Sequence, residues 1–277
     1  MGERCDLGHT RRAVMDIAVY HDLGSGELSR GCLLHALASA YAGRARVRRI
    51  FADELCASDE WHARTRLLAL PGGADRPYCE KLDGRGNASI RRFIEAGGKL
   101  LGMCAGAYYS CARIAWEAAR PGEITGQREL ALFAGTGRGS LHELAEPYAL
   151  DHLRCAALVP VHAPGAARTL SALYWGGPEL VPDSGARYTP LLTYAFPDGR
   201  SGLAAARMEV GRGRVVLCGV HTEITGAQLA CEVSRQGDDS FEHGMQLCLA
   251  LQRADAERQA AFDLLLGALD ADELGAA

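Results

Sequence analysis

Several features that would place a chain in a special class are missing from this sequence. No stretch approaches the roughly 20 apolar residues that a membrane-spanning helix needs, and the segment from Met1 to Arg12 lacks the apolar core of a secretion signal. Basic residues do not predominate, since the formal net charge is -4, so nothing favours binding to a phosphate backbone. The sequence therefore predicts a soluble, cytoplasmic protein that binds neither nucleic acid nor a membrane.

The patterns of metal, disulfide and nucleotide sites are also missing. No Cys-x-x-Cys occurs among the ten cysteines, and the nine histidines do not supply closely spaced pairs for zinc. A chain of 277 residues, 48% of them hydrophobic, forms a sizeable core without disulfide bonds. Gly24-Ser25-Gly26 follows an apolar run as a dinucleotide fingerprint would, but Ser29 stands where the third glycine belongs. We expect no metal and no cofactor.

The first 120 or so residues alternate between short apolar runs and helical patterns. A buried strand is predicted at 13–20, and further strands at 47–51, 67–70 and 99–103. Helices are predicted from about Leu28 to Gly43, at 87–95 and at 105–112. This alternation predicts an α/β fold with a mostly parallel sheet covered by helices on both faces.

The rest of the chain is less regular. Short strands are predicted at 130–133, 157–161, 171–175 and 191–194, and a hairpin at 202–209 and 214–220. The pattern from 241 to 269 is helical, with a break near Ala254. We expect additional antiparallel strands in this half and, because no repeat or linker divides the sequence, a single domain over residues 1–277.

The segment Gly102-Met103-Cys104-Ala105-Gly106 has the form G-x-C-x-G, the cysteine version of the nucleophile elbow. Its glycines allow a tight strand-to-helix turn to pass close to its neighbours. The predicted strand before Cys104 and the predicted helix after it provide that context, and a helix N-terminus favours a thiolate. The alternative is a small apolar cysteine at a tight turn. Pattern and context together favour the nucleophile.

A thiol nucleophile needs a base, and the base needs an acceptor that orients it. Gly219-Val220-His221-Thr222-Glu223 offers both at the end of an apolar strand. In an extended segment His221 and Glu223 lie on one side, so that the carboxylate is able to hold the imidazole. Taken alone, a histidine at a strand end is more often a packing or surface residue; the elbow is what favours a catalytic role.

Pro71-Gly72-Gly73 follows the third predicted strand. Such a turn brings bare backbone N–H groups close to a nucleophile at the neighbouring strand end. We expect the amides of Gly73 and Ala105 to form an oxyanion hole. An ordinary turn is the alternative interpretation.

Together, these motifs resemble the class I glutamine amidotransferase superfamily. PGGADRPYCEKL at 71–82 and GNASIRRFIEAGGKLLGMCAGAYYS at 86–110 are similar to the N-terminal domain of eukaryotic-type biotin–protein ligases, which also occurs as a free-standing bacterial protein. The resemblance extends from Ile17 to about Glu223. It implies a flavodoxin-like sheet and a triad of Cys104, His221 and Glu223.

The resemblance also implies a substrate pocket and a departure from glutamine. Glutamine-hydrolysing members usually continue the elbow as G-x-C-x-G-x-Q, whereas Tyr108 occupies the last position here. By similarity to the ligase-type subfamily, substrate-binding positions are expected from two loops and the elbow: Gly72, Asp75, Tyr78, Tyr108, Trp175 and Gly176. Each of the loop residues is alternatively a packing residue.

The leading hypothesis is a cysteine-dependent amide hydrolase or amidotransferase acting on a small-molecule substrate. Transfer to an acceptor would need a synthetase or acceptor-domain protein as a partner, since no such domain is expected in this chain. Two alternatives stay open: a non-catalytic module that binds a metabolite in the same pocket, and a redox-sensing cysteine protein of the DJ-1-like type.

Overall fold

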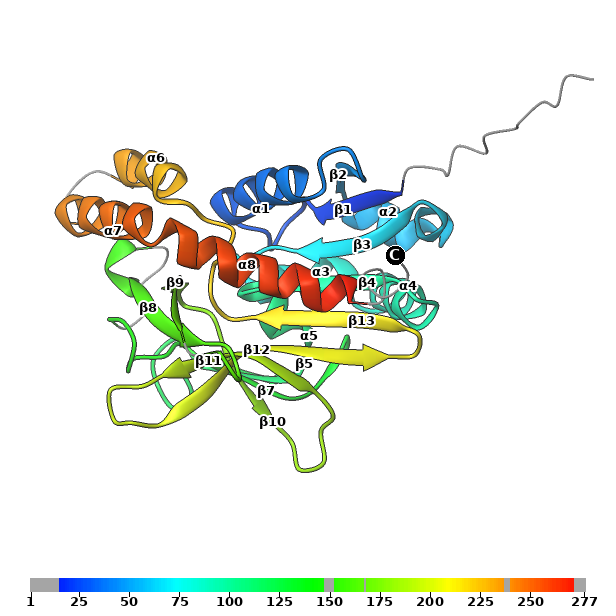
Figure 1. Cartoon of the computed structure of the whole chain (residues 1–277). Coiled ribbons are helices and arrows are strands. Elements are labelled where there is room, and N and C mark those ends of the chain that lie inside the picture. Colours follow the sequence, from blue (N-terminus) through cyan, green and yellow to red (C-terminus); the bar gives the residue numbers. More distant parts are fainter. Residues whose placement is uncertain (1–14, 147–151, 167, 237–239, 272–277) are drawn as a thin grey trace, which may run out of the picture.

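The structure is a computed structural model that describes residues 15–146, 152–166, 168–236 and 240–271. Its first half alternates strands with helices (Figure 1). These elements are β1 (Asp16–Tyr20), α1 (Glu27–Ala40), β2 (Arg46–Ile50), α2 (Ala52–Ala57), β3 (Thr65–Leu70), α3 (Asp75–Leu82), α4 (Arg85–Glu95), β4 (Lys99–Met103) and α5 (Ala105–Ser110). Residues 13 and 14 of the strand predicted at 13–20 lie outside the described residues; the rest of that strand, the other predicted strands and the longer helices of this half are confirmed.

The second half consists mainly of strands and ends in three helices. The strands are β5 (Cys111–Trp116), β6 (Ile124–Gln127), β7 (Phe133–Gly139), β8 (Ala156–His162), β9 (Thr169–Trp175), β10 (Glu179–Pro182), β11 (Thr189–Ala195), β12 (Ser201–Val210) and β13 (Gly213–Cys218). The helices are α6 (Gly226–Gln236), α7 (Phe241–Arg253) and α8 (Asp255–Asp270), so the predicted break at Ala254 is confirmed.

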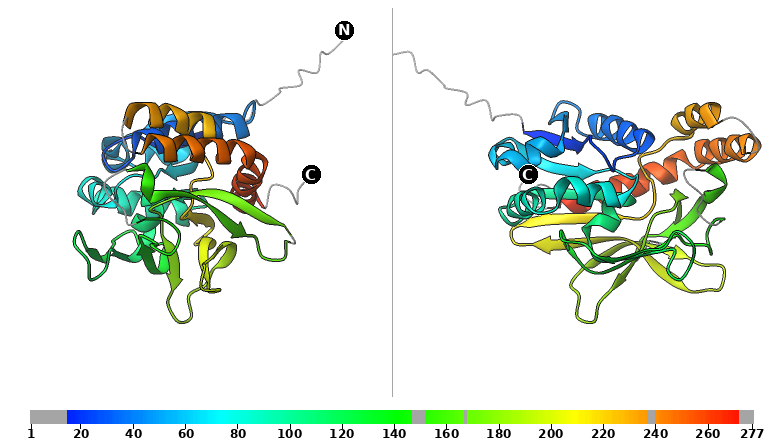
Figure 2. Two further views of the ribbon diagram at one scale, coloured as in Figure 1. Left: turned by 90° about the vertical axis from the view of Figure 1, so that its left-hand side faces the viewer. Right: turned by 180° about the vertical axis from the view of Figure 1, so that it is seen from behind.

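The strands form two sheets. The larger has nine strands in the order β2-β1-β3-β4-β13-β12-β11-β8-β9, and its first five strands run parallel. The antiparallel strands β12, β11, β8 and β9 extend it from β13. The smaller sheet has the order β10-β7-β5-β6. It lies on the side of the molecule away from α1 and α6 (Figures 1 and 2).

Alternation along β1 shows how the large sheet is covered. Ile17 and Val19 pack in a core that includes residues of α1 and α8. Ala18 and Tyr20 point to the other face, where the core includes residues of α3 and α4. Both faces are thus buried, which explains why β1 and β3 are mainly apolar, whereas the edge strand β2 (RVRRI) is partly exposed. In the described part of the chain, no helix combines the length and the apolar character that crossing a bilayer requires.

Several local predictions differ from the structure: Asp75 and Tyr78, expected in a loop, lie on α3, and neither α2 and α3 nor the strands β5, β6 and β10 were predicted. The helix predicted to reach residue 112 ends at Ser110, and β5 begins at Cys111. The strand predicted at 130–133 is a loop up to Leu132, and β7 starts only at Phe133. The helix α6 was not predicted. In each case the pairing of distant strands or the packing of a helix end, rather than local hydrophobicity, decides the boundary.

Candidate active site

Cys104 occupies the sharp turn between β4 and α5. Its backbone has φ 46° and ψ -103°, a conformation that residues with a side chain rarely adopt. The turn is held by the Cys104 N–H, which donates to the Cys218 carbonyl at 2.8 Å. A Cβ on Gly106 would lie 2.3 Å from the Leu70 carbonyl oxygen, and one on Gly102 would lie 2.9 Å from the Gly106 carbonyl oxygen. Both glycines of the motif are therefore required by close backbone contacts.

His221 and Glu223 follow the end of β13, the strand beside β4. The backbone N–H of His221 donates to the Leu173 carbonyl at 2.7 Å, and its Nδ1 lies 2.8 Å from Glu223 Oε1. Burial lowers the pKa of His221, but the Glu223 carboxylate and the Cys104 side chain raise it more, so this pKa lies well above its usual range. The arrangement favours a charged imidazolium between Glu223 and the sulfur.

The sulfur of Cys104 opens on a cavity of about 320 Å³. Its lining combines the thiol and imidazole with backbone from two glycine loops, apolar walls and charged groups: Gly26, Glu27, Leu28, Ser29, Gly72, Gly73, Cys104, Trp175, His221, Ile224, Glu232 and Arg235. A Cβ on Gly72 would lie 2.6 Å from His221 Cε1 and 3.2 Å from Cys104 Cβ. The bare glycine backbone is thus what leaves room beside the nucleophile.

Backbone hydrogen bonds orient the Pro71-Gly72-Gly73 turn. The Gly72 carbonyl accepts from the Gly26 N–H at 2.7 Å, and the Ala74 N–H donates to the Gly24 carbonyl at 2.8 Å. Because C=O and N–H point in opposite directions across a trans peptide, the Gly73 N–H points away from Gly26. Ala105 is the first residue of α5, where the N–H groups have no acceptor within the helix.

A family model described as "Biotin-protein ligase, N terminal" matches residues 15–273. The chain belongs to this family. A protein of Chlamydia muridarum carrying the name "Uncharacterized protein" is 31% identical over 213 residues, which cover 75% of this chain and 80% of that one. The biotin–protein ligase of Schizosaccharomyces pombe is 28% identical over 229 residues, 76% of this chain but 34% of the ligase. The chain thus corresponds to about a third of that ligase.

Solved structures show what fold this member of the biotin–protein ligase N-terminal family has. A glutamine amidotransferase from Thermotoga maritima superposes with a TM-score of 0.58 over 92% of this chain and 97% of that one, at 10% identity. A glutamine amido transferase from Methylobacillus flagellatus gives a TM-score of 0.54 over 93% and 95%, at 13% identity. The fold is therefore of the class I glutamine amidotransferase type.

In this biotin–protein ligase N-terminal family member, four of the six residues expected to bind substrate lie outside the cavity lining: Asp75, Tyr78, Tyr108 and Gly176. Asp75 Oδ2 accepts from Arg128 Nε at 2.6 Å, and the Tyr78 hydroxyl donates to the Pro71 carbonyl at 2.9 Å. The Tyr108 hydroxyl donates to the Gly176 carbonyl at 3.1 Å. All three side chains make contacts within the protein, and those of Tyr78 and Tyr108 hold the backbone at Pro71 and Gly176.

The loop after β9 contributes the wall opposite the Gly72 turn. Trp175 lines the cavity, and its carbonyl oxygen lies 3.7 Å from Cys104 Sγ. Within the described ranges, the Trp175 Nε1 is buried without a hydrogen-bond partner. Gly176 has φ 72° and offers its carbonyl to Tyr108. Of the six expected substrate positions, the structure therefore places only Gly72 and Trp175 in the cavity lining.

Sequence reasoning missed Ser29, which the structure places at the centre of the site. Its Oγ donates to Glu223 Oε1 at 2.8 Å and accepts the Gly72 N–H at 2.9 Å. In the sequence, Ser29 stood out only because it occupies the position where a nucleotide-binding loop would have its third glycine, and this argued against a nucleotide site. Since 194 residues separate Ser29 from Glu223, no local pattern could reveal the contact.

Proposed function

We propose that this chain is a cysteine-dependent amide hydrolase or amidotransferase. The carrying observation is the buried imidazole of His221, held by Glu223 at 2.8 Å and electrostatically coupled to Cys104 at the end of a cavity. A thiolate next to an imidazolium is the reactive form of a cysteine nucleophile.

The reaction follows from the positions of these groups. The Cys104 thiolate adds to the carbonyl carbon of a carboxamide, and the amides of Gly73 and Ala105 stabilise the oxyanion. His221 gives its proton to the leaving nitrogen, so that ammonia or an amine departs and a thioester remains. Water then attacks the thioester while His221 takes up its proton, and collapse releases the acid and the thiolate. Transfer of the ammonia would require a partner protein that activates the acceptor.

The cavity lining supports a small-molecule substrate. Leu28, Trp175 and Ile224 supply apolar surface in the lining of the cavity. The lining also includes the charged residues Glu27, Glu232 and Arg235. Among these, Arg235 Nη1 lies 3.8 Å from Glu27 Oε1 and 3.7 Å from a Glu232 carboxylate oxygen. Tyr108 fills the space behind the elbow where glutamine-hydrolysing relatives usually carry glutamine, so we propose a carboxamide other than free glutamine.

Release of ammonia from a panel of carboxamides, L-glutamine included, tests the proposal. Cys104→Ala is expected to reduce turnover of the best substrate by on the order of 10⁴-fold or more, because it removes the nucleophile. Cys248→Ala is the matched control, because Cys248 is a buried cysteine of α7 that is not part of the cavity lining. L-Glutamine should be a poor substrate.

Two outcomes would contradict the proposal. Ammonia release that survives Cys104→Ala would exclude the cysteine mechanism. A protein that binds members of the panel without consuming any would instead be a binding module with the same pocket.

A further inference from the structure

The start of α1 holds the turn that carries the proposed oxyanion site. Gly26, the residue before α1, donates its N–H to the Gly72 carbonyl at 2.7 Å. Ser29, in the first turn of α1, accepts the Gly72 N–H at 2.9 Å. These two bonds fix the peptide units on both sides of Gly72, so α1 sets the direction of the Gly73 N–H.

The same serine hydroxyl reaches the carboxylate that orients the histidine. Ser29 Oγ and His221 Nδ1 each lie 2.8 Å from Glu223 Oε1. The three side chains are shielded from solvent, with exposures of 6% for Ser29, 4% for His221 and 1% for Glu223. Water therefore does not compete effectively for these bonds, and their directions follow from which groups are able to donate.

Donor and acceptor roles run in one direction along this chain of bonds. The Gly72 amide only donates, so the Ser29 oxygen accepts and its own proton is directed to Glu223 Oε1. An ionised carboxylate only accepts, so His221 Nδ1 carries a proton. The Nε2 of His221 is then the ring nitrogen that is left for the Cys104 thiol.

We propose that Ser29 is a positioning residue that joins the two halves of the site. It holds the Gly72–Gly73 turn and, through Glu223, fixes His221 with a proton on Nδ1. This inference deepens the proposed function and rests on it for its catalytic meaning. The hydrogen-bond chain itself is measurable without any turnover.

The tight packing around Gly72 explains why the link uses a small side chain. A Cβ on Gly72 would lie 3.1 Å from Ser29 Oγ as well as 2.6 Å from His221 Cε1. Ser29→Ala preserves this packing and removes only the hydroxyl. The Gly72 amide then loses its acceptor, and Glu223 Oε1 loses one of two donors. Both groups are buried, where an unmade hydrogen bond is costly.

The test compares Ser29→Ala with Ser29→Thr, which keeps a hydroxyl, and with Ser25→Ala. Ser25 is a matched control, because it is a buried serine of the same loop whose Oγ donates to the Asp22 carbonyl at 2.7 Å. Ser29→Ala is expected to slow alkylation of Cys104 at neutral pH by about 10-fold or more and to shift the NMR resonance of the His221 Nδ1 proton. Ser29→Thr should recover much of both signals, and Ser25→Ala should match the wild type.

The outcomes separate this inference from the proposed function. If the wild type hydrolyses no carboxamide, the proposed enzymatic function is wrong. A shifted Nδ1 resonance in Ser29→Ala would still establish that Ser29 links the Gly72 turn to Glu223 and His221. A Ser29→Ala protein with the wild-type alkylation rate and the wild-type resonance would overturn it. Should Ser29→Ala fail to fold, hydrogen exchange in the wild type decides. The Gly72 amide should exchange much more slowly than the Gly73 amide, and equally fast exchange would refute the link.

Discussion

At the scale of single residues, Glu223 Oε1 is the meeting point of the site, since it receives both Ser29 and His221. Its charge and that of Cys104 are the reasons why the pKa of His221 lies well above the usual range despite burial. A raised histidine pKa means that the imidazolium is present throughout neutral pH and is lost only at higher pH. Cys104 therefore has a cationic neighbour at neutral pH.

Alkylation of Cys104 as a function of pH reports on this pair. In the wild type the rate should be high already at neutral pH. In His221→Ala the rate at neutral pH should be lower than in the wild type, because the stabilising cation is gone. Glu223→Gln should have a smaller effect in the same direction, since it keeps the shape and loses the charge. Superimposable curves for the three proteins would remove His221 and Glu223 from the site.

The elbow and the histidine motif could be recognised from sequence because each is local. The elbow motif spans the five consecutive residues 102–106, although Gly106 is required by a contact with Leu70 of β3, and His221 and Glu223 lie two residues apart in one segment. Ser29 could not be recognised, because its partners come from two other segments. The glycines of β7 have a similar explanation: a Cβ on Gly139 would lie 1.7 Å from the Tyr108 hydroxyl, which no local pattern indicates.

At the scale of elements, the parallel strands were predictable and several other strands were not. A strand covered by helices on both faces is a continuous apolar run, as in β3. The strand β7 has the sequence FAGTGRG, in which glycine predominates and only alternate residues are buried. It is a strand because it pairs with β5 and β10, which are distant in sequence.

The end of α8 is anchored to the large sheet by one carboxylate. Asp270 accepts from the Tyr41 hydroxyl at 2.8 Å, Arg66 at 2.9 Å and Lys99 at 2.7 Å. Burial raises the pKa of Asp270, but the hydrogen bonds from Lys99 and Tyr41 and the nearby positive charges lower it more. A carboxyl with a lowered folded-state pKa stabilises the fold above its unfolded pKa, and this contribution is lost as the pH falls.

Asp270→Asn should therefore lower the free energy of unfolding by about 1.5–3 kcal/mol at pH 7, as expected for hydrogen bonds to a charged group. The difference from the wild type should shrink as the pH falls below about 4, where the unfolded chain takes up the same proton. Urea unfolding at several pH values measures both effects. Asp263→Asn, at an exposed position of the same helix, is the control. An Asp270→Asn deficit that is independent of pH would contradict the electrostatic explanation.

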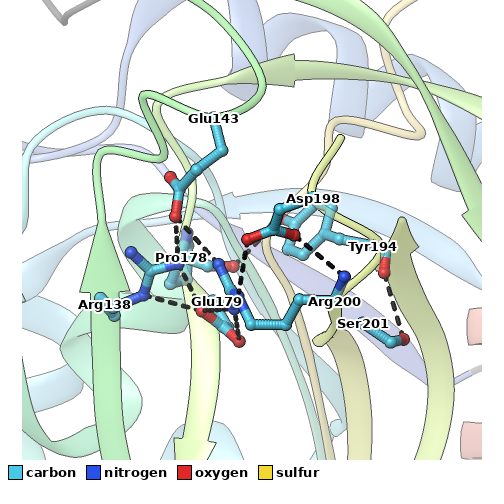
Figure 3. Close-up of polar contacts among 8 residues, drawn as sticks. All are labelled: Arg138, Glu143, Pro178, Glu179, Tyr194, Asp198, Arg200 and Ser201. Atoms are coloured by element: carbon cyan, nitrogen blue, oxygen red, sulfur yellow. Dashed lines mark hydrogen bonds and ion pairs between the residues drawn. The ribbon is translucent and has the colours of Figure 1, made fainter. Parts of the chain in front are cut away.

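At the scale of the whole molecule, the two sheets meet beside the candidate site. Glu179 begins β10 of the small sheet and receives Arg138 Nε of β7 at 2.7 Å and Arg200 Nη1, from the turn between β11 and β12, at 3.0 Å (Figure 3). Arg138 and Arg200 also bind Glu143. The Glu179 carboxylate thus connects the small sheet to the antiparallel part of the large sheet.

This junction continues to the histidine through close backbone contacts. Pro178 lies next to Glu179, and its carbonyl accepts from the Tyr194 hydroxyl at 3.0 Å. A Cβ on Gly219 would lie 2.0 Å from the Pro178 carbonyl oxygen, and one on Gly177 would lie 1.8 Å from the Gly219 carbonyl oxygen. Gly219 is two residues from His221. We propose on this basis that the two sheets belong to a single domain and unfold together.

Glu179→Gln tests the junction. It removes the charge that two arginines share while keeping the shape, so the wild type and the variant should each unfold in one transition, with the variant less stable by about 1–3 kcal/mol. Hydrogen exchange should increase in β10 and in the loop from Trp175 to Pro178, while β1, β3 and β4 stay protected, because they have no contact with the arginines.

The control is Asp198→Asn, since Asp198 is 62% exposed and its carboxylate lies 3.9 Å from Arg200 Nε. Exposed ion pairs of this kind contribute little, so the control should unfold like the wild type. If calorimetry of the wild type instead resolves two transitions, of which Glu179→Gln lowers only one, then the small sheet is a separate unit and the single-domain proposal is wrong.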